Sequence, residues 1–409
     1  MIYQISAPDR IHTRISLPAS KSISNRALIL NALSYSPYLP ENLSDCDDTQ
    51  VMIKAFDSDS ATFDIGAAGT SMRFLTAFLS KIGGVWEITG SERMQNRPIG
   101  ILVDALRQCG AQIEYLTKEG YPPLKITGRA LRGGQLTLNG GISSQYISAL
   151  LMIAPTMMEG LTLHLTGKII STPYIRMTLG MLAKFGIESE WQGDTIHIRP
   201  QEFRPIHFKV ESDWSAASYW YEIASLCDDA EILLTGLERE SLQGDARIAE
   251  FFIPLGVTSE FTSEGVILRQ SHQTAERLDL DLSDQPDLAQ TLVVTCVLKG
   301  IPFCFTGLES LKIKETDRIV ALRDELRKLG FRITDRDDCI LEWNGERCDI
   351  QADAVIATYE DHRMAMAFAP VALVSESVFI AHPQVVSKSY PAYWDHLQQA
   401  GFKISSLPR

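Results

Sequence analysis

The chain has 409 residues, of which 45% are hydrophobic and 22% charged, and its formal net charge is −13 at pH 7. A chain of this length exceeds one compact core, so we expect two domains. The acidic balance argues against a nucleic-acid-binding protein. No apolar run approaches the roughly 18–20 residues that a membrane span needs, so no membrane partner is expected.

Cysteine usage and the N-terminus indicate a cytoplasmic protein. The seven cysteines form no C-x-x-C pair, which is typical of reduced, mostly buried thiols rather than of a zinc site. Residues 1–14 carry early charges and have no apolar core before a cleavage site, so no signal peptide is expected.

Six segments in chain order share a polar start, rich in Ser, Asp or Arg, followed by an apolar helix. They begin near Ser20, Ala68, Ser143, Asp213, Pro286 and Asp361, and from the second onward they recur about every 70 to 75 residues. The apolar helices lack a strong polar face, so we expect them to be buried inside the domains.

A second element alternates with the first. Strands end at Thr89-Gly90, Thr166-Gly167, Thr235-Gly236 and Thr306-Gly307, and an amphipathic helix follows that stops at Gly110, Gly186, Gly256 or Gly330. The first unit is abbreviated, with its second helix near 47–56, and the last ends with a helix over 392–399. Six βαβ-like units divide naturally into two domains of three.

Five segments place a cation at an expected helix start: 20–26, 69–73, 97–99, 314–318 and 361–364. A helix N-terminus is already partly positive, so each cation there costs a few tenths to about 1 kcal/mol. The arrangement makes sense if an anion lies between the cations and the free N–H groups. We therefore predict a site for phosphate and carboxylate groups, in a cleft on which the polar helix starts converge.

The motifs in these segments resemble those of the 5-enolpyruvylshikimate-3-phosphate (EPSP) synthase family, over the whole chain and in order. They are Ser20-Lys21-Ser22-x-Ser24-Asn25-Arg26, Ala68-Gly69-Thr70-x-Met72-Arg73, Arg97-Pro98, Ser143-Ser144-Gln145, Lys314-Glu315-Thr316-Asp317-Arg318 and Asp361-His362-Arg363-Met364-Ala365-Met366. The resemblance implies an α/β fold of two similar domains, each of three βαβαββ repeats with buried helices (an inside-out α/β barrel), and an active site in the interdomain cleft. Residues 19–212 would form one domain, and 1–18 with 213–409 the other.

The resemblance also implies the reaction. The family transfers the enolpyruvyl group of phosphoenolpyruvate to the 5-hydroxyl of shikimate 3-phosphate and releases phosphate, by addition–elimination through a tetrahedral intermediate. This step belongs to the shikimate pathway, which leads to chorismate and the aromatic amino acids. No metal and no organic cofactor is implied, and the enzyme would be a monomer.

Roles carry over residue by residue. The resemblance implies that Asp287 is the base near the 5-hydroxyl, that Glu315 donates a proton to the methylene carbon, and that Lys314 stabilises developing charge. Shikimate 3-phosphate would be bound by Lys21, Ser22, Arg26, Ser143, Ser144, Gln145, Ser171, Tyr174, Asp287, Ser310 and Lys314. Phosphoenolpyruvate would be bound by Lys21, Gly69, Arg97, Gln145, Arg318, Arg363 and Lys388.

Simpler readings of the same residues stand beside these roles. Taken alone, Asp287 is equally explained as a helix cap, and Asp284 is a weaker candidate for the base. Taken alone, the KETDR segment is explained as an ion pair on a surface helix. Arg73 is as much a structural arginine as a ligand, and His362 is more an orienting than a catalytic group. A carboxylate such as Glu315 acts as an acid near neutral pH only if burial or the substrate phosphate raises its pKa.

Departures from the family pattern leave glyphosate sensitivity open. Ala67 and Ser310 stand where many members have Asn, and Phe74 stands where Pro is common. Two rival functions remain. The related UDP-N-acetylglucosamine enolpyruvyltransferase usually has a reactive Cys in the loop matched by 90–96, which here has none. An anion-binding repeat protein without turnover would explain the cations but not the pairing of Lys314 and Glu315 with Asp287.

Overall fold

The structure is a computed structural model that describes residues 1–407, apart from the side chain at position 313. The chain forms two compact units. We call Ala19–Val210 the inserted unit, and Met1–Pro18 with Glu211–Arg409 the terminal unit. The division expected from the sequence assigns residues 211–212 to the other unit and otherwise has the same boundaries.

The inserted unit contains two sheets and three long helices that begin with predicted motifs. Its helices are α1 (Lys21–Leu33), α2 (Asp47–Phe56), α3 (Gly69–Lys81), α4 (Glu92–Gln95), α5 (Gly100–Gln108), α6 (Ser144–Ile153) and α7 (Thr172–Lys184). Its strands are β3 (Thr62–Asp64), β4 (Gly84–Thr89), β5 (Gln112–Tyr115), β6 (Leu124–Gly128), β7 (Gly134–Asn139), β8 (Leu161–Thr166), β9 (Glu190–Gln192) and β10 (Thr195–Ile198).

The terminal unit contains three sheets, and both ends of the chain contribute strands to them. Its helices are α8 (Trp214–Leu226), α9 (Ile248–Phe251), α10 (Ala289–Lys299), α11 (Arg318–Lys328), α12 (His362–Phe368) and α13 (Tyr393–Gln399). Its strands are β1 (Ile2–Ser6), β2 (Ile11–Ser16), β11 (Ala230–Thr235), β12 (Val257–Phe261), β13 (Gly265–Gln270), β14 (Leu278–Asp281), β15 (Phe303–Thr306), β16 (Thr334–Arg336), β17 (Ile340–Trp343), β18 (Val355–Ile356), β19 (Val378–Ala381) and β20 (Lys403–Leu407). Short 3-10 helices that matter below are η2 (Gly244–Arg247), η4 (Pro286–Leu288), η5 (Glu309–Ile313) and η7 (Pro383–Lys388).

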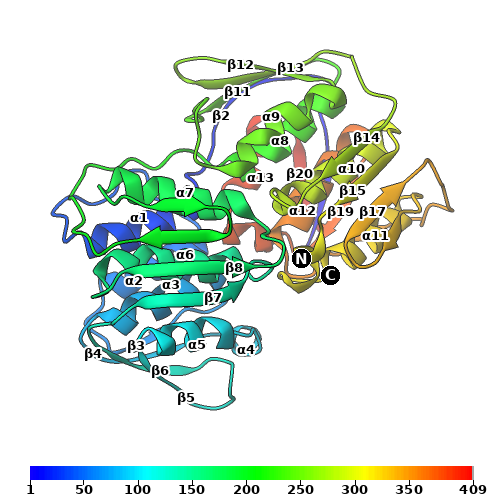
Figure 1. Ribbon diagram of the computed structural model, residues 1–409. Coiled ribbons are helices and arrows are strands. Elements are labelled where there is room, and N and C mark those ends of the chain that lie inside the picture. Colours follow the sequence, from blue (N-terminus) through cyan, green and yellow to red (C-terminus); the bar gives the residue numbers. More distant parts are fainter. Residues whose placement is uncertain (408–409) are drawn as a thin grey trace. The chain divides into compact units, whose positions relative to one another are not determined.

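Within residues 1–407 the strands form five four-stranded sheets that share one topology (Figure 1). In the sheet β7-β8-β10-β9, the first two strands are parallel, the second pairs antiparallel with the fourth, and the fourth pairs antiparallel with the third. A helix follows each of the first two strands, so the unit reads βαβαββ, as the family resemblance implied.

The two exceptions to a simple tandem order involve the first strands of the chain. Strand β2 pairs in parallel with β11, so this repeat is split by the inserted unit. Strand β1 lies between β19 and β20 and completes the last repeat. The first repeat of the inserted unit is abbreviated, as predicted: it has α1, α2 and an isolated parallel bridge between Glu41 and Lys209.

The Thr-Gly signals mark strand ends in the structure. Thr89, Thr166, Thr235 and Thr306 are the last residues of β4, β8, β11 and β15. At Gly307 the φ angle is +76°, and a Cβ there would lie 2.2 Å from Ser283 Oγ. Only glycine therefore fits at this turn without strain.

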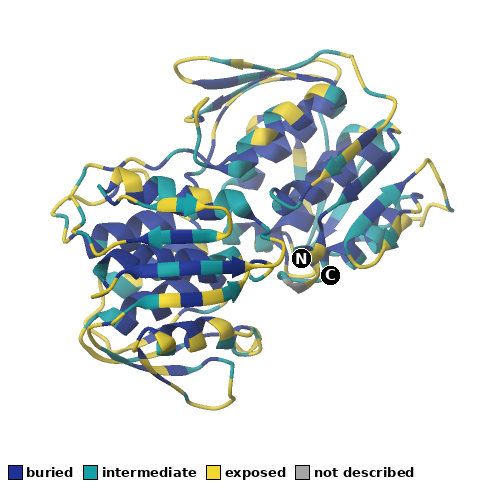
Figure 2. Ribbon diagram, in the orientation of Figure 1, coloured by how far each residue is buried: buried dark blue, intermediate teal, exposed yellow. Residues whose placement is uncertain are grey.

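The polar-start helices form the core of each unit, as their apolar character predicted. Helices α1, α3 and α6 pack on one another in the inserted unit, and α8, α10 and α12 do so in the terminal unit. Every residue of α12 is buried, as is every residue of α3 except Lys81. Figure 2 shows the exposed residues gathered at turns and on outer elements such as α5. Among residues 1–407, no helix has both the length and the apolar character required to cross a bilayer.

One expected helix start is wrong. The Arg97-Pro98 pair was predicted to open a helix, but α5 begins at Gly100 after Ile99 at its cap position. The Pro98 carbonyl instead accepts hydrogen bonds from Tyr146 Oη at 2.5 Å and from Arg73 Nη2 at 3.4 Å. These side-chain bonds hold Arg97 in a loop before the helix.

Candidate active site

The predicted site residues divide between the two units, and we call the set in each unit a cluster. The terminal cluster contains Asp287, Ser310, Lys314, Glu315, Arg318, Arg363 and Lys388. The inserted cluster contains Lys21, Ser22, Arg26, Gly69, Arg97, Ser143, Ser144, Gln145, Ser171 and Tyr174. Each cluster is described within its own unit.

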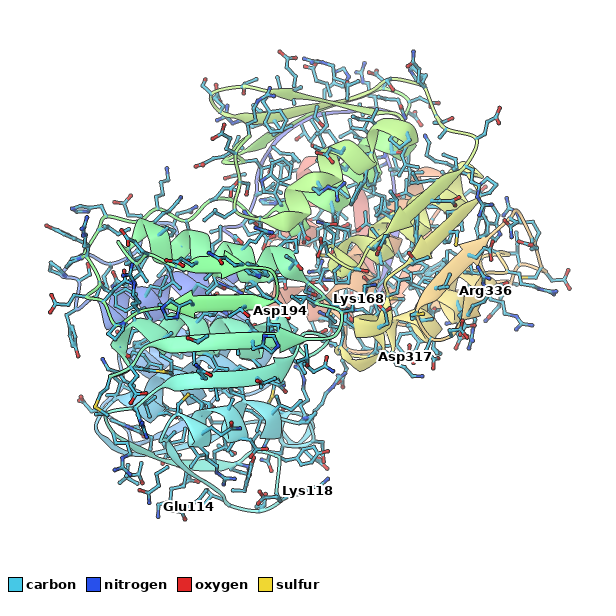
Figure 3. All side chains as sticks on the ribbon, viewed as in Figure 1. Glu114, Lys118, Lys168, Asp194, Asp317 and Arg336 are labelled. Atoms are coloured by element: carbon cyan, nitrogen blue, oxygen red, sulfur yellow. The ribbon has the colours of Figure 1, made fainter. Side chains whose placement is uncertain are left out.

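Arg318 is the centre of the terminal cluster. It is the first residue of α11, next to the capping residue Asp317 (Figure 3), and only 1% of its surface is exposed. Its Nη1 donates to Asp287 Oδ1 at 2.9 Å and its Nη2 to Glu315 Oε2 at 2.9 Å. One guanidinium thus joins two carboxylates that the sequence separates by 28 positions. The sequence gave no indication that Arg318 would join these two carboxylates.

Asp361 is a third carboxylate on Arg318, and sequence reasoning gave it no role. Its side chain is fully buried and accepts from Arg318 Nε at 2.7 Å. It also caps α12 by accepting from the backbone N–H of Arg363 at 2.9 Å. An Asp directly before a helix start was the available signal, but such a residue is read as a cap alone. The structure shows that it performs both tasks.

Asp287 lies among cations rather than at a helix cap. The cap position of α10 is Leu288, so the capping alternative for Asp287 is wrong. Lys314 Nζ lies 3.6 Å from Asp287 Oδ1, and Arg363 Nη2 lies 3.4 Å from Oδ2. Burial raises the pKa of Asp287, but Arg363, Lys314 and Arg318 outweigh it and hold the pKa well below the usual range. Asp287 is therefore ionised at neutral pH.

Glu315 is also held in its charged form. Lys388 Nζ lies 2.8 Å from Glu315 Oε1, while Arg318 holds the other oxygen. Burial raises the pKa of Glu315, but the nearby Lys388, Arg318 and His362 lower it by more than burial raises it. The pKa of Glu315 is therefore well below the usual range. Glu315 precedes α11, and its partner Arg318 has only 2% of its side chain exposed. The alternative of an ion pair on a surface helix is therefore wrong.

Lys388, His362 and Ser310 surround this network. Lys388 ends η7 and reaches Glu315 from outside the helices that carry the other groups. His362 Nε2 shares a 2.9 Å hydrogen bond with Ser389 Oγ, which fits an orienting role. The Ser310 Oγ is buried and has no hydrogen-bond partner among residues 1–407.

In the inserted cluster, Lys21 and Arg26 both lie on α1. Lys21 is the first residue of α1, after Ser20 at the cap position. Arg26 is buried, donates from Nε to Thr178 Oγ1 at 2.8 Å and from Nη2 to Ser148 Oγ at 3.0 Å. Its Nη1 donates to the carbonyl of Ser22 at 2.9 Å, one turn earlier. Burial lowers the pKa of Arg26 to about 10.

Gly69 lies against two guanidinium groups. A Cβ at position 69 would lie 2.6 Å from Arg97 Nη1 and 3.1 Å from Arg73 Nη1. Arg73 is buried and donates from Nη1 to the Gly69 carbonyl at 2.9 Å. Burial and the nearby Arg97 lower its pKa to about 10. The structure thus brings Arg97 and Gly69 together, as predicted, around an arginine that we had weighed as structural.

The remaining residues lie at helix starts. Ser143 caps α6 and accepts from the backbone N–H of Gln145 at 3.3 Å. The Gln145 side chain donates to Thr70 Oγ1 at 3.2 Å, which links the starts of α6 and α3. Ser171 occupies the cap position of α7 with a φ of +53°, a strained conformation for a serine. The Tyr174 carbonyl accepts from Arg26 Nη2 at 3.4 Å.

The chemistry available to these clusters is anion binding and proton transfer. The terminal cluster sets four cations against Asp287, Glu315 and Asp361. Such a network binds carboxylate or phosphate groups well, because guanidinium forks match their geometry. In the part of the chain that the structure describes, no group of three His, Cys, Asp or Glu side chains is placed to hold a metal ion. The seven cysteines, all within that part, are free thiols.

Comparison with known proteins identifies the family. The model of the family described as EPSP synthase (3-phosphoshikimate 1-carboxyvinyltransferase) matches residues 5–58 and 53–397. A 3-phosphoshikimate 1-carboxyvinyltransferase of Bacteroides fragilis is 59% identical over 405 residues, which cover 99% of both chains. A protein of the same name from Vibrio cholerae is 37% identical over 418 aligned positions, which cover 95% of this chain and 97% of the relative.

The fold agrees with these matches. The EPSP synthase structure from Acinetobacter baumannii superposes with a TM-score of 0.81 over 99% of this chain and all of that one, at 22% sequence identity. The predicted two-domain α/β fold is thereby confirmed. By its sequence over almost its whole length, this chain belongs to the EPSP synthase family.

Proposed function

We propose that the chain transfers the enolpyruvyl group of phosphoenolpyruvate to the 5-hydroxyl of shikimate 3-phosphate and releases phosphate. The observation that carries this assignment, beyond family membership, is the buried network in which Arg318 joins Asp287 to Glu315. It supplies two carboxylates for proton transfer and four cations for anionic substrates in one place. An anion-binding protein without turnover explains the cations but not the pairing of Lys314 and Glu315 with Asp287.

Asp287 is the proposed base for the 5-hydroxyl. Its lowered pKa makes it a weak base while Arg363, Lys314 and Arg318 surround it. Phosphoenolpyruvate brings a carboxylate and a phosphate that compete for Arg318 and Arg363. Sharing these cations with the substrate raises the proton affinity of Asp287, so the base becomes effective once the substrate has bound.

Glu315 is the proposed donor of the proton that the methylene carbon receives. In the free protein it is ionised, because Lys388 and Arg318 outweigh its burial. A phosphate that draws Lys388 away, and that adds negative charge nearby, raises the pKa of Glu315. We therefore infer that Glu315 takes up its proton together with phosphoenolpyruvate, and returns to the carboxylate when phosphate leaves.

The inserted cluster is proposed to bind shikimate 3-phosphate through Lys21, Ser22, Arg26, Ser143, Ser144, Gln145, Ser171 and Tyr174, with Asp287, Ser310 and Lys314 from the terminal unit. Phosphoenolpyruvate would contact Lys21, Gly69, Arg97, Gln145, Arg318, Arg363 and Lys388. Residues of both units on the same two substrates require the units to close on them. Solution scattering tests this: the radius of gyration should fall with shikimate 3-phosphate, and an unchanged value would count against closure.

A phosphate-release assay tests the reaction itself. With phosphoenolpyruvate as donor, release is expected with shikimate 3-phosphate and not with UDP-N-acetylglucosamine. Asp287→Asn and Glu315→Gln should each slow turnover by at least 100-fold, the usual contribution of a general acid or base. Asp284→Asn and Glu376→Gln are matched controls, since neither residue contacts Arg318, Asp287 or Glu315 in the hydrogen bonds and ion pairs described above, and both should stay near the wild-type rate. Full release by both Asp287→Asn and Glu315→Gln would refute the catalytic assignment.

We also infer that the enzyme works in the cytoplasm as a monomer, without metal or organic cofactor. Dialysis against a chelator should leave the rate unchanged, and sedimentation equilibrium should give the mass of one chain. Loss of activity that added divalent cation restores would contradict the cofactor inference.

A further inference from the structure

Glu325 is a buried carboxylate of the terminal unit that the proposed chemistry does not use. It lies on α11, and its side chain is fully buried. Its Oε1 accepts a 2.6 Å hydrogen bond from Tyr359 Oη, and its Oε2 accepts from the backbone N–H of Ala357 at 3.0 Å. Lys328 Nζ donates to the same Oε2 at 2.6 Å. Three donors from two segments of the chain therefore meet on one carboxylate.

Two of these donors belong to the segment that leads into α12. We call residues 357–361 the α12 loop, because they lie between β18 and α12. Within it, Tyr359 and Glu360 have φ angles of +53° and +56°. This conformation is uncommon for residues with a Cβ, and it persists where surrounding contacts fix it. The hydrogen bonds that Glu325 accepts from Tyr359 and Ala357 are such contacts.

The α12 loop ends at Asp361, which links it to two arginines of the terminal cluster. Asp361 accepts from Arg318 Nε at 2.7 Å and from the backbone N–H of Arg363 at 2.9 Å. Arg318 is the first residue of α11, and Glu325 lies about two turns further along the same face of that helix. Helix α11 therefore holds the loop at two points, and the position of Asp361 depends on both.

We propose that Glu325 and Tyr359 are positioning residues for phosphoenolpyruvate. They hold the α12 loop in the conformation in which Asp361 aligns Arg318 and the start of α12, which carries Arg363. This inference rests on the proposed function, in which both arginines bind phosphoenolpyruvate. A displaced loop would turn the guanidinium groups away from the geometry that a carboxylate or a phosphate requires.

Steady-state kinetics of Tyr359→Phe in the full-length protein test the proposal. The change removes one hydroxyl and keeps the ring, which is 38% exposed, so it opens no internal cavity. The KM for phosphoenolpyruvate should rise about tenfold, the usual worth of a hydrogen bond to a charged group. The KM for shikimate 3-phosphate should change by less than about twofold, because the α12 loop contains none of the residues proposed to bind it.

Tyr221→Phe is the matched control. Tyr221 belongs to the same unit, and its Oη shares a 2.8 Å hydrogen bond with Ser259 Oγ, outside the α12 loop. The control thus loses the same atom and one hydrogen bond, and both KM values should stay within about twofold of wild type. An equal rise of both KM values in Tyr359→Phe, or no rise, would overturn the proposal. So would a control that raises the KM for phosphoenolpyruvate as much as Tyr359→Phe does.

A double-mutant cycle with Glu325→Gln tests whether the two residues act together. Glutamine has one acceptor oxygen, so it cannot serve the donors on both sides of Glu325. Alone, the change should raise the KM for phosphoenolpyruvate about tenfold. In the Tyr359→Phe background the added rise should be less than about threefold, because the amide can then direct its oxygen to Ala357 and Lys328. Additive losses would refute the pairing. If Glu325→Gln fails to fold, Tyr359→Phe and its control decide the question.

The outcomes also separate this inference from the proposed function. If the wild-type protein releases no phosphate with shikimate 3-phosphate, the proposed function fails. If the wild type turns over and Tyr359→Phe does not separate the two KM values, only the positioning role fails.

Discussion

Replacing Asp245 by Asn is expected to stabilise the terminal unit above pH 6, although it removes a hydrogen-bonded carboxylate. Asp245 lies in η2, is 4% exposed, and accepts a short hydrogen bond from Ser215 Oγ. Burial and the nearby Asp287 raise its pKa from 3.8 to about 6, while Arg363 opposes the rise. The charged form of Asp245 is therefore a cost to the folded state.

The size and the sign of the effect follow from this shift. A difference of about two pKa units corresponds to about 3 kcal/mol. Between about pH 4 and pH 6 the folded state holds a proton on Asp245 that the unfolded state has released, so stability falls as the pH rises through this window. Asn is neutral and still accepts from Ser215. Its advantage should grow from near zero at pH 4 to about 3 kcal/mol at pH 8, or about 6–12 °C in Tm for a unit of this size.

Guanidinium unfolding at pH 4 and pH 8 provides the measurement. Tryptophan fluorescence reports mainly on the terminal unit, which holds Trp214, Trp220, Trp343 and Trp394. Asp228→Asn, an exposed change in the same unit, is the control and should shift stability by less than about 0.5 kcal/mol. The reasoning is refuted if Asp245→Asn is less stable than wild type at pH 8, or if its gain is the same at both pH values.

Two further substitutions test the packing of each unit. Gly69→Ala places a methyl group 2.6 Å from Arg97 Nη1, a side-chain end that can move; steady-state kinetics should show KM for phosphoenolpyruvate raised about tenfold, with Tm lowered by no more than about 4 °C. Unchanged kinetics would mean that Arg97 does not bind this substrate. Glu222 is fully buried, and neither of its carboxylate oxygens has a hydrogen-bond partner among residues 1–407. Glu222→Met should therefore raise the unfolding free energy by about 1–3 kcal/mol in denaturant titrations, and a loss of stability would reveal a role for the acid.

The repeat architecture was predictable because its signals are local. Thr306 followed by Gly307 marks a strand end wherever a turn requires a positive φ, and an apolar helix without a polar face has to be buried. The failure at Arg97-Pro98 has the opposite cause. Proline at the first position favours a helix, but Tyr146, which lies 48 residues further on, takes the Pro98 carbonyl. No local pattern contains that contact.

The residues of the candidate site were named from the sequence, but the contacts that join them were not. Motifs shared with the family named Asp287, Glu315 and Arg318, but nothing in their spacing said that one guanidinium would hold both carboxylates. Asp361 was read only within a motif. It acts through Arg318, which lies 43 residues away in the chain, so its importance depends on tertiary packing that composition and periodicity do not encode.

The position of β1 between β19 and β20 has a consequence for synthesis on the ribosome. Strand β1 completes a sheet whose last strand, β20, is made about 400 residues later. At 5–20 residues per second this delay is roughly 20 to 80 s. The inserted unit is continuous in sequence and is free to fold during that time, while β1 and β2 still lack the strands with which they pair. The chain is then most in need of protection from self-association during its synthesis, before β11 and β20 are available for pairing.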